Sequence, residues 1–186
     1  MKTKHFFILF LIHLLNINSY SQKSFISYDK VKVEDITSIE KSFYSKTYQS
    51  KLETVEGTED TIIRYGKPKY YNRQENKSYG KIQVTYYYLE KDSLVRKISY
   101  LWITPKNTKL EDYSKKFDKV VEQISSDLGK PKPNQGKLTK IYEENLGERH
   151  ERRVTWNYKD AEITLLMIWS RNHGANLNIG VNWKNK

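Results

Sequence analysis

Apolar residues recur with two different periods along the chain, and each period predicts one kind of element. Between residues 110 and 128 the steps are three and four residues, which places the apolar side chains on one stripe of an amphipathic helix. The stripe consists of Leu110, Tyr113, Phe117, Val120, Val121, Ile124 and Leu128. We therefore expect a helix over 110–128.

In other segments apolar and polar residues alternate, as they do in a strand with one buried face. Short polar links such as 159–160 and 172–174 separate these segments, so neighbouring strands should pair antiparallel. The four tryptophans share the parity of the apolar residues and are expected in the core. The alternating sets are Ile82, Val84, Tyr86 and Tyr88; Ile98, Tyr100 and Trp102; Val154, Trp156 and Tyr158; Ile163, Leu165, Met167 and Trp169; and Leu177, Ile179, Val181 and Trp183.

The triplet Gly-Lys-Pro occurs twice, at 66–68 and at 129–131. A glycine followed by a proline is a helix stop, because glycine accepts a left-handed cap and proline cannot continue the helix. The triplets therefore predict helices over 58–65 and 110–128, with Gly129 as a left-handed cap, and a further helix is expected over 34–48. A phosphate-binding glycine loop would precede a helix, so nucleotide binding is disfavoured.

These elements indicate an α+β fold, namely an antiparallel β-meander sheet with helices packed on one face. Each triplet is followed by a polar loop and then by strands, which predicts two tandem modules at 57–104 and 105–186. A segment with a helix, 22–56, precedes them within one compact domain.

The beginning of the chain has the pattern of a secretory signal peptide. Lys2 and Lys4 precede the apolar stretch 6–15, and Ser19 and Ser21 supply the small residues that a signal peptidase reads. We expect cleavage near Ser21 and a secreted or periplasmic location. An uncleaved anchor is the alternative, although about ten apolar residues are too few to span a bilayer.

The amino-acid composition excludes several classes of protein and of site. The chain of 186 residues is 37% hydrophobic, which excludes an intrinsically disordered protein, and it has no Cys, which excludes disulfides, thiolate nucleophiles and Cys zinc sites. The formal net charge is +11, from 33 Lys plus Arg against 22 Asp plus Glu. Many of these lysines reflect a bias in composition, so charge alone is weak evidence of function.

One stretch resembles a known family. Gly57-Thr58, Ile62-Ile63, the 65–68 segment Tyr-Gly-Lys-Pro and the tyrosines 86–88 are similar to the pattern of the small outer-membrane lipoprotein family SmpA/BamE. Two such modules in tandem also resemble the layout of the β-lactamase inhibitor protein family. The lipid-bearing Cys of the former and the disulfides of the latter are missing here. The resemblance implies a non-catalytic envelope or binding protein.

Cationic and aromatic residues gather around the first triplet and suggest a binding surface. Cations acting together there would attract an anionic partner, and an exposed strand tyrosine such as Tyr87 would stack on a sugar or anchor a protein. The competing interpretation is a set of solvating lysines and an ordinary cross-strand tyrosine pair. A thinner cationic group follows the second triplet, at Lys130, Lys132, Lys137 and Lys140. The candidate binding residues are Lys67, Lys69, Tyr70, Tyr71, Arg73 and Tyr87.

The chain offers no familiar catalytic constellation. Beyond the signal peptide its histidines are His150 and His173, with Glu148 and other acids nearby. Glu148 and His150 would supply two metal ligands, whereas a zinc site needs three or four, and the arginines around them oppose a cation. We interpret 143–153 as a mixed-charge surface loop and expect no catalytic residues, metal or cofactor.

The sequence thus predicts an exported, non-enzymatic binding module of the bacterial cell envelope. Its partner would be a protein or an anionic envelope component, with peripheral membrane contact allowed by the positive charge and with nucleic acid disfavoured. The alternatives are a structural or assembly factor of the outer membrane and, less favoured, a hydrolase acting through His150 or His173. The partner's identity and the oligomeric state stay open.

Overall fold

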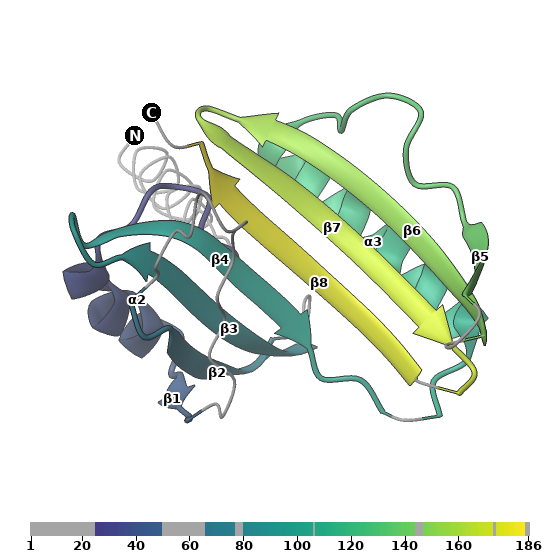
Figure 1. The fold of residues 1–186 in the computed structure, drawn as a ribbon, viewed down its shortest axis with the longest axis horizontal. Coiled ribbons are helices and arrows are strands. Elements are labelled where there is room, and N and C mark those ends of the chain that lie inside the picture. The colour runs from purple at the N-terminus through teal and green to yellow at the C-terminus, as the bar shows by residue number, and fades with distance from the viewer. Residues whose placement is uncertain are drawn as a thin grey trace, which may run out of the picture.

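One antiparallel sheet of eight strands, in the order β1-β2-β3-β4-β8-β7-β6-β5, organises the protein (Figure 1). The computed structural model describes residues 25–49, 66–76, 80–105, 107–143, 147–172 and 174–184. The strands are β1 (Lys46–Thr47), β2 (Lys69–Asn76), β3 (Gly80–Leu89), β4 (Leu94–Trp102), β5 (Thr139–Glu143), β6 (Gly147–Tyr158), β7 (Ala161–Ser170) and β8 (Gly174–Trp183).

The helices of the described residues are a 3-10 turn, η1 (Val33–Asp35), and two α-helices, α2 (Ile36–Ser42) and α3 (Leu110–Leu128). The prediction of a helix over 110–128 is confirmed, and its stripe buries Tyr113, Phe117, Val120 and Ile124. In Figure 1 this helix lies behind β6 and β7, which it contacts. Neither α-helix combines the length and the apolar character that a membrane crossing requires.

The predicted α+β fold with two helix-covered modules is wrong. Strands β4 and β8 pair directly, Ile98 with Val181 and Tyr100 with Ile179, so the sheet runs without a break from β1 to β5. The described chain is mostly strand, and α2 has only seven residues. Over the residues that the structure describes, the fold is therefore a single β-sheet accompanied by two α-helices.

Three segments have a secondary structure that differs from the prediction, and all three differences reduce the helix and loop content in favour of strands. The helix expected over 34–48 ends at Ser42, because Tyr44 adopts a positive φ of 52° and the chain then turns into β1. Residues 69–76, expected to form a polar loop, form β2, and the mixed-charge segment 143–153 contributes to β5 and β6. The predicted helix over 58–65 and the predicted signal peptide lie outside the described residues.

The two faces of the sheet differ as the alternation predicts. The inner face, against which the helices pack, buries every member of the alternating sets except Tyr88, Tyr158 and Trp169, which are partly buried. Three of the four tryptophans are thus fully in the core, and the indole N–H of Trp169 donates to the carbonyl of Thr108 at 2.9 Å. The opposite, outer face carries residues of the other parity, among them Tyr48, Tyr70, Tyr87 and Ser99.

Gly129 ends α3 with a backbone conformation that differs from the predicted cap. Its φ is 83° and its ψ is −165°, and its N–H donates to the carbonyl of Ser125 at 2.9 Å. This region is essentially restricted to glycine, at a cost of about 1–3 kcal/mol for other residues. No atom lies within 4 Å of a Cβ built at this position, so the constraint is in the backbone and not in crowding.

Replacing Gly129 by Val should therefore lower the free energy of unfolding by about 1–3 kcal/mol, measured by urea denaturation. Gly129→Ala should lose much of the same free energy, because the strain does not depend on side-chain size. The matched control is Ser126→Val on the exposed side of α3, where only helix propensity changes, by a few tenths of a kcal/mol. Equal losses in Gly129→Val and Ser126→Val would contradict the constraint.

Candidate ligand-binding site

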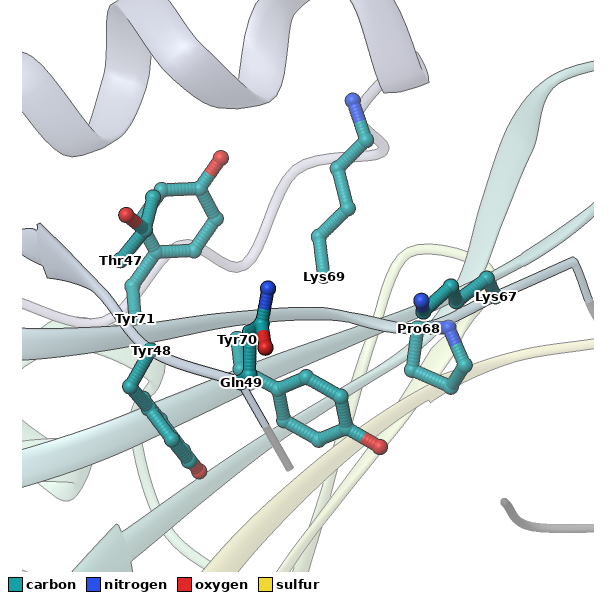
Figure 2. Close-up of a pocket in the computed structure, with 8 residues that line it drawn as sticks. All are labelled: Thr47, Tyr48, Gln49, Lys67, Pro68, Lys69, Tyr70 and Tyr71. Carbon is teal, nitrogen blue, oxygen red and sulfur yellow. The ribbon is translucent and has the colours of Figure 1, made fainter. Parts of the chain in front are cut away.

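A pocket of about 280 Å³ lies at the edge of the sheet, where β1 ends and β2 begins (Figure 2). The pairing of the two strands is short, Lys46 with Asn72 and Thr47 with Tyr71, followed by a hydrogen bond from the Tyr48 N–H to the Tyr70 carbonyl at 3.2 Å. We call this the edge pocket. It is lined by Thr47, Tyr48, Gln49, Lys67, Pro68, Lys69, Tyr70 and Tyr71.

Two tyrosines form the aromatic part of the edge pocket. The ring centroids of Tyr48 and Tyr70 are 5.3 Å apart with a 50° angle between the planes, and Figure 2 shows both rings on the same side of β2. Burial raises the pKa of Tyr48, although a hydrogen bond with the Thr85 side chain opposes the rise. Both rings are half-buried, so the pair combines a defined geometry with accessible aromatic surface.

The charge of the edge pocket is positive. Lys67 is exposed and Lys69 is half-buried, and none of the described residues that line the pocket carries a carboxylate. Two further pockets differ in this respect: one brings Lys32 and Lys69 together with Glu34 and Asp92, and another holds Glu151 beside Arg153. Lys67 thus offers a cation to an anionic group without a carboxylate among the described lining residues, whereas Lys69 also borders the pocket of Glu34 and Asp92.

Gly66 sets the position of Lys67 at this pocket. Its N–H donates to the Tyr88 carbonyl at 3.0 Å, which continues the pairing of β2 with β3 before β2 formally begins. A Cβ at residue 66 would lie 2.5 Å from the Tyr88 ring, so only glycine allows this approach. The first Gly-Lys-Pro triplet therefore serves strand packing at this point.

Arg73 was predicted as a surface cation, and this prediction is wrong. Its side chain is 0% exposed and is held by Glu40 of α2, with Arg73 Nη2 donating to Glu40 Oε1 at 2.6 Å. The guanidinium carbon lies 3.9 Å from the centroid of the Phe43 ring, and Nη1 donates to the Phe25 carbonyl. The Tyr86 hydroxyl also donates to Glu40. Since this cluster is closed to solvent, Arg73 cannot contact a partner.

The remaining candidates divide between the two faces of β2. Tyr71 is 7% exposed and packs edge-on against the Tyr86 ring, so it belongs to the core even though it lines the pocket. Figure 2 shows Lys69 and Tyr71 on one side of β2 and Tyr70 on the other. Tyr87 lies on the outer face of β3, two residues after Thr85, which pairs with Tyr70. The Lys97 ammonium lies 5.2 Å from the centroid of the Tyr87 ring.

Lys67, Lys69 and Tyr70 thus all line the edge pocket, with Lys69 and Tyr70 on opposite sides of β2, and Tyr87 lies nearby on the same face as Tyr70. The structure adds Tyr48 and Gln49, which sequence reasoning missed. They had been assigned to the end of the helix predicted over 34–48 and to the segment after it. A signal was present in the β-favouring pair Thr47-Tyr48 after a serine, but two paired residues are too few to show a period.

The charged residues around His150 are paired with one another on β5 and β6. Arg149 contacts Glu143 at 2.6 Å, and Lys140 contacts Glu148 at 2.5 Å. The His150 ring packs edge-on against Trp169, and its Nε2 lies 3.8 Å from Glu148. Within the described residues no group of three or more His, Cys, Asp and Glu side chains is arranged to hold a metal ion. His173 lies outside the described residues.

The second cationic group does not form a site comparable to the edge pocket. Lys132 pairs with Glu162 at 2.8 Å, and Lys140 with Glu148 as described above. Lys130 and Lys137 are exposed, and Lys137 lines the pocket that contains Glu151. Carboxylates therefore accompany the cations at this end of the sheet.

Comparisons with known proteins leave the family open. No family model, curated protein or solved structure matches the chain. The resemblance to SmpA/BamE and to the β-lactamase inhibitor protein family stays a prediction from sequence.

The buried ion pair leads to a prediction about stability. Glu40→Gln leaves the Arg73 charge buried without its counterion and should lower the free energy of unfolding by about 3–5 kcal/mol. The double change Glu40→Leu with Arg73→Met removes both charges and should lose much less. Urea denaturation measures both.

Glu34→Gln provides the matched control, because Glu34 pairs with Lys32 at the surface with 73% of its side chain exposed. An exposed pair contributes about 0–1 kcal/mol. A loss in Glu40→Gln no greater than that in Glu34→Gln would show that the buried pair does not hold α2 on the sheet.

Buried tyrosines predict a loss of stability in alkali. Burial raises the pKa of Tyr86, Tyr100 and Tyr113 above the ordinary value of 10.0. Above about pH 10 the unfolded chain releases these phenolic protons while the folded chain retains them, so the free energy of unfolding should fall as pH rises. Urea midpoints between pH 8 and pH 11 test this, and Tyr113→Phe should flatten the decline. A slope identical to that of the native chain would refute the assignment.

Proposed function

We propose that this chain is a non-enzymatic binding module whose edge pocket recognises an anionic component of the bacterial cell envelope. The observation that carries the proposal is the combination, in one pocket of about 280 Å³, of a tyrosine pair with two lysines and, among the described lining residues, no carboxylate. A secreted or periplasmic location, expected from the signal-peptide pattern, would expose the pocket to such ligands. The proposal extends to an acidic protein segment only as an alternative outcome of the binding test.

The rigidity of its surroundings supports a binding role for this pocket. The buried Arg73–Glu40 pair holds α2 against the inner face of β2, directly beneath the strand that carries Tyr70 and Lys69. Glycine at 66 holds the chain leading into Lys67 against Tyr88. A preorganised site loses less conformational entropy on binding than a mobile one, so modest contacts suffice.

Electrostatics predict a weak, salt-sensitive interaction. Each lysine near an anionic surface contributes about 1 kcal/mol, and the contribution falls as added salt screens the charges. Lys46 is exposed one residue before Thr47 and lies on the outer face opposite Asn72, where it adds to the positive potential. Affinity should therefore decline steeply between low and physiological ionic strength.

The double variant Lys67→Glu with Lys69→Glu should weaken binding to an immobilised anionic polymer, heparin-agarose, by about tenfold or more, seen as elution at lower NaCl concentration. The control is Lys115→Glu with Lys119→Glu, which makes the same change of net charge at exposed positions of α3. Equal effects of the two double variants would show that retention follows net charge and would overturn the edge pocket as the site.

A further inference from the structure

The register of the sheet places one line of small residues across the outer face, starting at the edge pocket. Tyr70 pairs with Thr85, Thr85 with Ser99, Ser99 with Gly180, Gly180 with Thr164, and Thr164 with Thr155. Because Cα partners on adjacent strands share a face, these side chains form one row perpendicular to the strands. We call it the hydroxyl row. With six strands about 4.8 Å apart, its length is about 24 Å.

The two ends of the hydroxyl row are more buried than its middle. At one end the Tyr48 side chain is hydrogen-bonded to the Thr85 side chain, and Thr85 is only 9% exposed. At the other end the Gln135 side chain accepts from the Thr155 N–H at 2.6 Å, and Thr155 is 5% exposed. Between them lie Ser99, Gly180 and Thr164, which are half-buried and carry no long side chain. The middle of the row is thus more accessible to a ligand than Thr85 and Thr155 are.

Polar side chains flank the row on β8, although Leu101 and Leu166 lie on either side of Asn178 on the neighbouring strands. The Asn178 side chain donates to the Ser99 hydroxyl at 3.0 Å. Asn182 follows Gly180 as the next outer-face residue of β8 and pairs with Lys97 of β4. Glu162, opposite Asn182, accepts from Lys132. Hydroxyl and amide groups both donate and accept hydrogen bonds, which matches a ligand rich in hydroxyl groups.

From these observations we infer that the anionic ligand is a polysaccharide that carries carboxylate groups, with a sugar ring against Tyr48 and Tyr70 and the chain continuing along the hydroxyl row. This inference rests on the proposed function and names its ligand class. The apolar C–H face of a pyranose ring packs on tyrosine, which offers a large surface with little rotamer entropy to lose. The uronate carboxylate would lie toward Lys67, the exposed lysine of the pocket.

Two other polyanions fit the surface less well. A single-stranded nucleic acid needs further aromatic residues along its path on which successive bases can stack, whereas Thr85, Ser99, Gly180 and Thr164 provide none. An anionic membrane favours protruding apolar groups, and the large hydrophobic side chains that are exposed, Ile103 and Leu138 among them, do not line the edge pocket.

The test compares four probes by isothermal titration at low salt: an alginate oligomer, a neutral cello-oligosaccharide, linear polyphosphate and oligo(dT). Alginate should bind. Tyr48→Ala and Tyr70→Ala should each weaken alginate about tenfold while changing polyphosphate less than twofold, because only the sugar uses the rings. Tyr70→Phe, which keeps the ring, should bind alginate like the native chain. Tyr142→Ala, at an exposed position on β5, is the matched control and should change neither.

A second variant tests the path along the row. Gly180→Leu places a bulky side chain between Ser99 and Thr164; its φ is not positive, and its Cβ would need only the Asn182 amide, 3.3 Å away, to yield. It should weaken a long alginate oligomer several-fold more than a uronate disaccharide.

Each outcome separates this inference from the proposed function. Tighter binding of oligo(dT) than of alginate, or equal losses for alginate and polyphosphate in the tyrosine variants, would overturn the polysaccharide while leaving an anion site. Equal losses for long and short uronates in Gly180→Leu would overturn the path along the row. Polyphosphate binding that is unchanged by Lys67→Glu with Lys69→Glu would overturn the anion site itself, and so would failure of every anionic probe to bind.

Discussion

The buried pair of Arg73 and Glu40 is the interaction on which the first half of the sheet depends. Two charges taken out of water are stable only with good geometry and further hydrogen bonds, and here Phe25, Tyr86 and the Phe43 ring complete the set. One cluster therefore joins the N-terminal segment, α2, β2 and β3. The edge pocket lies partly on this anchored strand, which holds the backbone of Lys69 and Tyr70 at the rim of the sheet.

Binding surface and core are separated by the pleat of the sheet. Residues of one parity on β2 to β4 and β6 to β8 fill the inner face, and residues of the other parity form the hydroxyl row. Because the apolar packing lies on the inner face, the outer face can carry small polar side chains such as Ser99 and Thr164. The proposed binding surface thus follows from the alternation of inner-face and outer-face residues along each strand. Tyr48 and Tyr70 lie at the edge of this surface, where the sheet ends.

How far sequence reasoning reached depends on how each element is stabilised. The helix over 110–128 and the strands around Val84, Tyr100, Ile163 and Ile179 were predictable, because apolar burial alone specifies them. Strand β2 was missed because its inner positions are Tyr71 and Arg73, and a buried arginine reads as a surface cation. Strands β5 and the first part of β6 were missed for a related reason: cross-strand ion pairs such as Arg149 with Glu143 take the place of an apolar pattern.

By itself the sequence determined the long helix, the strands with an apolar face and the aromatic, cationic character of the region after the first triplet. These properties depend on neighbours within a few residues, which a one-dimensional pattern records. Only the tertiary structure decided that the sheet is continuous through β4 and β8, that Arg73 is buried while Lys67 stays exposed, and that Tyr48 joins Tyr70. These features depend on strand pairing and on charge partners that are distant in sequence. Glu40 and Arg73, for example, are 33 positions apart, and no local period along the chain encodes their contact.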